Sequence, residues 1–175
     1  QLMRNHADDF GMTFDNLEFD WKKVISRSRN VSDKLAGGIE FLFKKNKVDY
    51  VLGTGKILEK GKVEVIASDG KQQILESEHI LVATGCKTRE FPDLPFNGLS
   101  VVGSSEAMVM ENQPKDIIII GAGAIGVEFA YFFNAFGTKV TIVEMMPNIL
   151  PVEDHEVSVE LEKSFKKSGI EILSS

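Results

Sequence analysis

The chain has 175 residues, of which 43% are hydrophobic and 26% are charged, and its formal net charge is −6. These values predict globular material for one domain or two small ones, and the acidic balance argues against a nucleic-acid partner or an anionic membrane surface. The sequence has no apolar run near the length of about 18 residues that a membrane span needs, and its opening QLMRNHADDF carries no secretory signal, so we expect a cytoplasmic protein.

Metal and disulfide chemistry are not indicated by the sequence. Cys86 is the only cysteine, which excludes a disulfide scaffold and a four-cysteine zinc site, and His6, His79 and His155 lie far apart along the chain. The chain begins at Gln1 rather than at a methionine and ends directly after the strand-like GIEILSS. We therefore expect an internal segment of a longer polypeptide.

Residues 19–46 predict a long amphipathic helix. The pair Gly37 and Gly38 weakens it by about 1 kcal/mol per glycine relative to alanine. Such a pair indicates either a kink or the close approach of another group to the backbone. The apolar stripe at helical spacing comprises Trp21, Val24, Ile25, Val31, Leu35, Ile39, Leu42 and Phe43.

Four short apolar runs separated by turn signals occupy residues 49–85. The EKG at 59–61 and the DG at 69–70 are typical of tight turns, and Asp-Gly between alternating runs predicts a hairpin. We expect a small antiparallel meander. A buried strand in HILVATG at 79–85, ending in a glycine turn, is expected to follow it.

Prolines and glycines punctuate residues 86–115 and predict a crossing between two domains. We expect residues 1–95 to form part of one domain and residues 96–175 part of another. The second domain carries an alternation of strand and helix that is typical of one half of a Rossmann-type α/β sheet. Its expected elements are strand Ile117–Ile120, helix 124–136, strand 139–143, helix 154–167 and strand 171–173.

A phosphate-binding pattern, GAGAIG at 121–126, lies between the first strand and the first helix of this domain. Gly121 would make the tight turn, Gly123 would let the backbone approach a pyrophosphate, and Gly126 would let helix and strand pack closely. The pyrophosphate would lie at the helix N-terminus, where free N–H groups and the helix dipole favour negative charge. The alternative is that the glycines serve only a tight turn.

Glu144 ends the next strand, KVTIVE, near the spacing of an acid that hydrogen-bonds the adenosine ribose 2′-hydroxyl. A carboxylate there repels a 2′-phosphate, and Met145 and Met146 supply no arginine to receive one. The pattern therefore favours NAD over NADP, the alternative being a solvent-exposed glutamate at a strand end. Asp154, at the start of the second helix, is expected to cap it rather than to bind a metal.

Together these features resemble the flavoprotein disulfide reductases, most closely their dihydrolipoamide dehydrogenase branch. The resemblance covers most of the chain, and the glycine pattern is common to the whole family. The matching segments are GGIEFLFKKNKV at 37–48, GTGKI at 53–57, ILVATG at 80–85, VVGSSEAM at 101–108 and PKDIIIIGAGAIGVEFA at 114–130.

The resemblance implies two cofactors, FAD and NAD. Cys86 is expected to pack beside the flavin rather than to act as a reactive thiol, Glu128 would reach toward the nicotinamide, and Glu144 would hold the adenosine ribose. The implied FAD contacts are Gly55, Thr84, Gly85 and Cys86, and the implied NAD contacts are Gly121, Ala122, Gly123, Ala124, Ile125, Gly126, Val127, Glu128 and Glu144.

The implied reaction is the oxidation of dihydrolipoamide to lipoamide through FAD, with NAD⁺ as the hydride acceptor. The implied partners are a lipoyl-bearing protein of a 2-oxoacid dehydrogenase or glycine cleavage complex, and a second copy of the enzyme. The family's N-terminal FAD fingerprint and C-x-x-x-x-C redox pair do not occur in these residues, so we expect the chain alone to hold no catalytic residue and to be inactive. The alternatives are a non-catalytic dinucleotide-binding module, or another flavoenzyme such as mercuric reductase or a soluble transhydrogenase.

Overall fold

The computed structural model describes residues 6–13, 15–16 and 18–175 and divides the chain into two compact units. The parallel-sheet unit comprises Gln1–Ile25 and Asn97–Ser175, and the meander unit comprises Ser26–Phe96. The border between Phe96 and Asn97 falls within the proline-rich crossing predicted over residues 86–115. The first segment, Gln1–Ile25, groups with the C-terminal residues rather than with the meander. The assignment of the two parts of the chain to an FAD domain and an NAD domain stays a prediction.

Helix α2 spans Trp21–Lys45, which confirms the long helix predicted over residues 19–46. A Cβ built on Gly37 or Gly38 would have no neighbour within 4 Å beyond the local helix backbone, so no other element of the meander unit approaches this pair closely. Along the part of the chain that the structure describes, no helix is both long and apolar enough to cross a bilayer.

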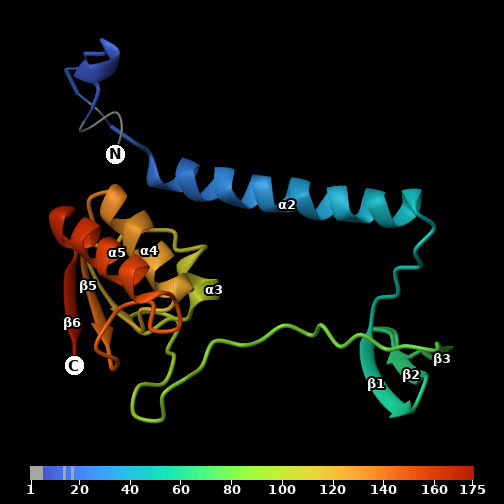
Figure 1. Ribbon diagram of the computed structural model, residues 1–175. Coiled ribbons are helices and arrows are strands. Elements are labelled where there is room, and N and C mark those ends of the chain that lie inside the picture. Colours follow the sequence, from blue (N-terminus) through green and yellow to red (C-terminus); the bar gives the residue numbers. More distant parts are fainter. Residues whose placement is uncertain (1–5, 14, 17) are drawn as a thin grey trace. The chain divides into compact units, whose positions relative to one another are not determined.

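The meander unit contains a three-stranded antiparallel sheet in the order β1-β2-β3, as the turn signals predicted (Figure 1). Gly61 and Gly70, in its two hairpin turns, have φ angles of 79° and 82°. Glycine adopts this left-handed region without the steric cost of a Cβ. The strands are β1 (Thr54–Glu59), β2 (Lys62–Ile66) and β3 (Gln72–Glu76).

The buried strand predicted at residues 79–85 is wrong. Leu81 and Val82 are 91% and 63% exposed, and no described strand pairs with this segment. An apolar run predicts burial, but a strand forms only where a neighbouring edge satisfies its backbone hydrogen bonds. Gly85 does adopt the left-handed conformation expected of the glycine turn, with a φ angle of 72°.

The parallel-sheet unit confirms the predicted alternation of strands and helices. Its sheet has the order β4-β5-β6, with both neighbouring pairs parallel (Figure 1). The short helices η1 (Asp8–Phe10) and α3 (Ser104–Ala107) also belong to this unit. The main elements are β4 (Asp116–Ile120), α4 (Ala124–Ala135), β5 (Lys139–Glu144), α5 (His155–Lys167) and β6 (Glu171–Ser174).

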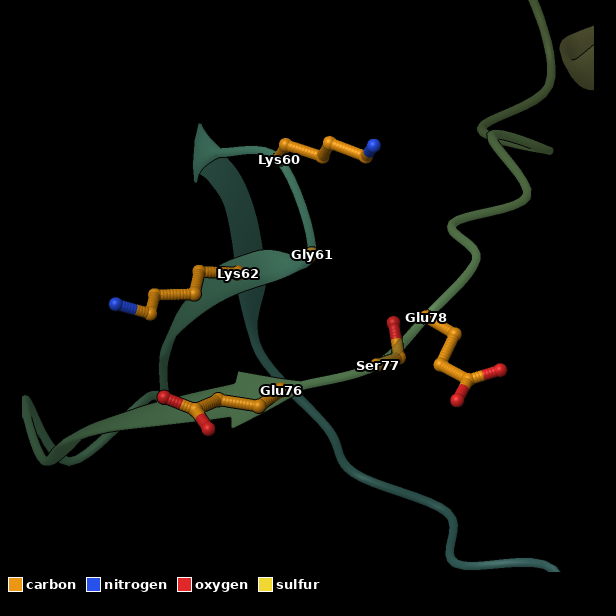
Figure 2. Close-up of a pocket in the computed structure, with 6 residues that line it drawn as sticks. All are labelled: Lys60, Gly61, Lys62, Glu76, Ser77 and Glu78. Carbon is orange, nitrogen blue, oxygen red and sulfur yellow. The ribbon is translucent and has the colours of Figure 1, made fainter.

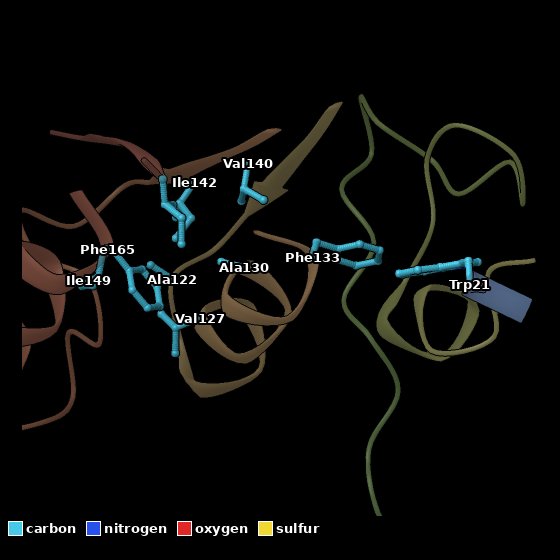
Figure 3. Close-up of a cluster of buried hydrophobic side chains, with 10 residues drawn as sticks. Trp21, Ala122, Val127, Ala130, Phe133, Val140, Ile142, Ile149 and Phe165 are labelled. Carbon is cyan, nitrogen blue, oxygen red and sulfur yellow. The ribbon is translucent and has the colours of Figure 1, made fainter. Parts of the chain in front are cut away.

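Most of the hydrophobic core lies between one face of this sheet and the helices α4 and α5, and Trp21, at the start of α2, packs against Phe133 of α4 (Figure 3). Side chains alternate along β4, so Ile117 and Ile119 pack against the core whereas Ile118 and Ile120 are 68% and 50% exposed. The helices therefore cover one face of the sheet. Ligands of α/β sheets bind at the carboxyl ends of the strands. The buried core comprises Trp21, Ala122, Val127, Ala130, Phe133, Val140, Ile142, Ile149, Phe165 and Ile170.

Candidate functional site

The glycine turn, which we define as residues 121–126, joins the carboxyl end of β4 to the first turn of α4. Gly121 has a φ angle of 101° and donates its N–H to the Val143 carbonyl at 2.8 Å, which fastens the turn to the neighbouring strand. Gly123 is the N-cap of α4 and has extended backbone angles. The first N–H groups of a helix lack partners within it, so this terminus can bind an anion.

Gly126 has a structural reason to be glycine. A Cβ at this position would lie 2.1 Å from the carbonyl oxygen of Gly121 and 3.2 Å from its carbonyl carbon. Both atoms belong to the backbone, so neither can rotate away. The third glycine of the pattern therefore permits the close packing of α4 against the end of β4.

Gly123 lies in a different environment. A Cβ built there would have no neighbour within 4 Å. Packing within the described protein therefore does not require glycine at this position. Open space beside a helix N-terminus suits the approach of a ligand to the backbone.

Glu144 binds the glycine turn directly. Its Oε2 accepts a hydrogen bond from the Ala122 N–H at 2.7 Å, and its Oε1 accepts one from the Met146 N–H at 2.8 Å. Burial raises the pKa of Glu144, but the backbone hydrogen bonds from Ala122, Met146 and Met145 lower it by more, so the pKa lies below its ordinary value. The carboxylate therefore stays ionised beside the turn at neutral pH.

We expect the Glu144→Gln variant to be less stable than the wild type by about 1–2 kcal/mol near neutral pH. Glutamine has one acceptor oxygen in place of two, so it keeps at most one of the two hydrogen bonds and loses the charge that strengthens it. The folded-state pKa is lowered, so below the ordinary value of about 4.3 the unfolded state binds more protons than the folded state. The contribution of Glu144 is thus complete above that value and disappears as the pH falls through the lowered pKa. Urea denaturation of both proteins at about pH 7 and about pH 3 measures it.

The control for this comparison is Glu171→Gln. Glu171 lies on the adjacent strand β6 of the same sheet. Its carboxylate accepts a hydrogen bond from the Thr141 hydroxyl and not from the glycine turn. An equal pH-dependent loss in both variants would mean that the effect is not specific to the carboxylate that binds the glycine turn. A stability difference for Glu144→Gln that is constant over the whole pH range would contradict the assignment.

The loop between β5 and α5 also contacts the glycine turn, at the carbonyl of Ala122 rather than at its N–H. The N–H of Leu150 donates to the Ala122 carbonyl at 2.8 Å, and the hydroxyl of Ser158 approaches the Leu150 carbonyl at 3.1 Å. Neither residue was expected at the site, since nothing in the sequence around Leu150 indicates its φ angle of 49°. The predicted N-cap is confirmed, because Asp154 Oδ1 accepts a hydrogen bond from the Glu156 N–H at 2.8 Å.

The remaining predicted NAD contacts differ in exposure. Ala122 and Val127 are 0% and 7% exposed, so neither residue presents more than a trace of surface to a ligand. Ile125 and Glu128 are exposed on the first turns of α4. The structure thus brings Glu144 and the glycine turn into contact, whereas Glu128 makes no contact with either among the described hydrogen bonds.

The predicted FAD contacts belong to the meander unit. Gly55 lies in β1 opposite Val65, and its Cβ position is 3.7 Å from the Val63 Cγ1. Residues 84–86 are exposed in the extended segment that follows the meander. Residues 84–86 belong to the meander unit, and their role in binding a flavin stays a prediction.

A surface depression of about 420 Å³ lies in the meander, at the end of its sheet (Figure 2). Its charges are mixed, and Lys62 forms an ion pair with Glu59 at 2.7 Å. None of the residues that line this depression belongs to the glycine turn. Its lining comprises Lys60, Gly61, Lys62, Glu76, Ser77 and Glu78.

Comparison with known proteins agrees with the resemblance seen in the sequence. The sequence model of the pyridine nucleotide-disulphide oxidoreductases matches residues 4–175. A dihydrolipoyl dehydrogenase from Zymomonas mobilis is 41% identical, over 97% of this chain and 36% of the relative. A second, from Acholeplasma laidlawii, is 42% identical, over 95% of this chain and 49% of the relative.

Solved structures give the same fold. The crystal structure of LpdA from Mycobacterium tuberculosis has a TM-score of 0.85 and 22% identity, over 98% of this chain and 38% of that chain. The flavoprotein disulfide reductase RclA from Escherichia coli has a TM-score of 0.73 and 26% identity, over 89% of this chain and 36% of that chain. The chain thus spans between about a third and a half of the length of these proteins. With the family's sequence model matched from residue 4 to residue 175, this chain belongs to the pyridine nucleotide-disulphide oxidoreductase family.

Proposed function

We propose that this chain forms the central part of a dihydrolipoyl dehydrogenase-like flavoenzyme and supplies its NAD site and part of its FAD site. The observation that carries the proposal is the contact between Glu144 and the Ala122 N–H, which joins the acid at the end of β5 to the glycine turn. An acid on the second strand and a glycine turn at the first helix are the two parts of a dinucleotide site. The dihydrolipoyl dehydrogenases among the relatives support the choice of reaction.

The residues of the turn fit a dinucleotide. The open space at Gly123 leaves room for a pyrophosphate, and the N–H groups of the first α4 turn, beginning at Ala124, face such a ligand with the positive end of the helix dipole. The two carboxylate oxygens of Glu144 have about four lone-pair positions, so at least one remains for the ribose 2′-hydroxyl beside the backbone hydrogen bonds. Glu128, exposed on α4, is proposed to reach toward the nicotinamide.

The flavin is proposed to contact Gly55 and residues 84–86. FAD and NAD supply the two-electron chemistry when they are bound, and the protein's part is to bind and orient them. The overall reaction converts dihydrolipoamide and NAD⁺ into lipoamide, NADH and a proton. The proposed partner is a lipoyl-bearing protein of a 2-oxoacid dehydrogenase or glycine cleavage complex, and the enzyme is proposed to be a cytoplasmic homodimer.

A turnover assay tests the reaction. The full-length flavin-loaded enzyme that carries this sequence should reduce NAD⁺ with dihydrolipoamide as the electron donor, and the 175-residue chain alone should not. NADH binding without turnover by the full-length protein would favour the non-catalytic dinucleotide-binding module. Absence of both would overturn the proposal.

We expect the enzyme to prefer NADH over NADPH, and the double variant Glu144→Ala, Met145→Arg to shift the ratio of the two affinities by roughly tenfold to a hundredfold toward NADPH. Removing the carboxylate weakens NADH binding, because the ribose 2′-hydroxyl loses a charge-assisted hydrogen bond worth about 1.5–3 kcal/mol. It also strengthens NADPH binding, because the 2′-phosphate is no longer repelled. Met145 is 82% exposed, so an arginine can extend there without displacing packed atoms. Fluorescence titration with both nucleotides measures the ratio.

The matched control for cofactor choice is Glu171→Gln, which removes a carboxylate from the adjacent strand without touching the glycine turn. It should leave the NADH to NADPH ratio unchanged. The double variant changes the net charge by +2 and Glu171→Gln by +1. A shift of the ratio in Glu171→Gln about half as large, on a logarithmic scale, as in the double variant would mean that net charge, rather than the position of Glu144, determines the preference.

A further inference from the structure

Ser158 is a buried hydroxyl near the start of α5 that the dinucleotide pattern does not explain. Its residue is 2% exposed, and its Oγ lies 3.1 Å from the Leu150 carbonyl oxygen and 3.2 Å from the Asp154 carbonyl oxygen. A helical serine often donates to the carbonyl four residues earlier, as here to Asp154. The additional contact to Leu150 reaches outside the helix, into the loop that covers the glycine turn.

Leu150 is held in an unusual backbone conformation. Its φ angle of 49° lies in the left-handed region, which non-glycine residues adopt only where surrounding contacts fix it. Two contacts do so: the Ser158 hydroxyl meets its carbonyl, and its N–H donates to the Ala122 carbonyl at 2.8 Å. The neighbouring Ile149 is fully buried and anchors the loop in the core.

The Ala122 carbonyl and the Gly123 N–H belong to one planar trans peptide, so they point in opposite directions. Fixing the carbonyl against Leu150 therefore fixes the direction of the Gly123 N–H. The preceding peptide is fixed separately, because the Ala122 N–H donates to Glu144. Both peptides on either side of Ala122 are thus oriented, one by a carboxylate and the other by the loop.

We propose that Ser158 is a positioning residue for dinucleotide binding: through Leu150 it orients the Ala122–Gly123 peptide whose N–H faces the pyrophosphate. This inference rests on the proposed NAD site. Ser158 itself is buried beneath the loop, so we expect it to act on the dinucleotide only through Leu150.

The test compares two buried hydroxyls in the flavin-loaded full-length enzyme. Ser158→Ala should raise the Kd for NADH by roughly tenfold, because a small misplacement of a binding group is costly, whereas Thr138→Val should change it by less than about twofold. Thr138 is also 2% exposed, but its hydroxyl donates to Pro114 at the amino ends of the strands, away from the turn. Ser158→Thr, which keeps the hydroxyl, should restore most of the affinity.

Two further measurements separate positioning from general destabilisation. In Ser158→Ala the KM for NAD⁺ should rise while the KM for dihydrolipoamide stays unchanged. The amide hydrogen of Leu150 should exchange faster with solvent in Ser158→Ala than in the wild type, and Thr138→Val should leave that exchange rate unchanged.

The outcomes are distinguishable. A wild type that binds no NADH overturns the proposed function and this inference with it. A wild type that binds NADH, together with a Ser158→Ala variant of equal affinity, overturns this inference alone. Equal weakening by Ser158→Ala and Thr138→Val also overturns it, because a buried hydroxyl would then act only through stability.

Discussion

Replacing Gly126 with alanine should destabilise the parallel-sheet unit by about 3 kcal/mol or more. The added Cβ would lie 2.1 Å from the Gly121 carbonyl oxygen, a distance that requires the backbone of α4 and β4 to move apart. A loss of this size is a large fraction of the 5–15 kcal/mol that stabilises a typical domain. Urea denaturation followed by far-UV circular dichroism measures it, and NADH binding should be lost in parallel.

Gly123→Ala is the matched control within the same turn. Gly123 has a φ angle of −71° and a ψ angle of 179°, which alanine adopts without strain, and its Cβ would meet no atom within 4 Å. The free energy of unfolding should therefore change by less than about 1 kcal/mol, while the affinity for NADH falls because the methyl group occupies the space proposed for the pyrophosphate. A Gly126→Ala protein as stable as Gly123→Ala would contradict the packing argument.

Local patterns were sufficient to predict the alternating strands and helices from β4 to β6, but not the grouping of Gln1–Ile25 with them. The four isoleucines of β4, the glycine spacing and the apolar period of α4 are each set by residues close in sequence, and parallel neighbours follow from the strand–helix–strand order. The sequence predicted that Glu144 hydrogen-bonds the adenosine ribose, but it did not predict the hydrogen bond between Glu144 and the glycine turn. The strand spacing places this acid beside the turn, but the sequence does not reveal that its oxygens also accept two backbone hydrogen bonds.

Features that depend on distant partners could not be predicted in this way. The apolar run at 79–85 predicts a strand, yet strand formation depends on a partner edge that the run itself does not specify. The left-handed Leu150 depends on Ala122 and Ser158, which hold its two backbone groups from different elements. Trp21 was predicted on the apolar stripe of α2, but its partner carbonyl, that of Met110, lies 89 residues away.

Trp21 should be a highly sensitive apolar position outside the sheet. It is 8% exposed, and its ring centroid lies 5.6 to 5.8 Å from those of Phe132, Phe133 and Phe136. Figure 3 shows its ring beside that of Phe133. Its indole N–H donates to the Met110 carbonyl at 2.8 Å. Trp21→Ala should therefore cost about 3–5 kcal/mol of unfolding free energy, measured by urea denaturation with circular dichroism, because it leaves a cavity and an unpaired carbonyl.

Two companion variants divide this effect into its parts. Trp21→Phe keeps an aromatic ring and loses the hydrogen bond, so it should cost less than Trp21→Ala, about 1–2 kcal/mol. Leu35→Ala truncates an apolar side chain on the same helix that is 66% exposed, and it should change stability by no more than about 0.5 kcal/mol. Equal losses in Trp21→Ala and Leu35→Ala would contradict the anchoring role of Trp21.

The aromatic partners of Trp21 lie in the second half of α4 and just beyond it, whereas the glycine turn lies at the start of this helix. Trp21→Phe should therefore lower the free energy of unfolding more than it lowers the affinity for NADH. Gly123→Ala should do the reverse, so the two variants separate the packing of α4 from the proposed use of its N-terminus.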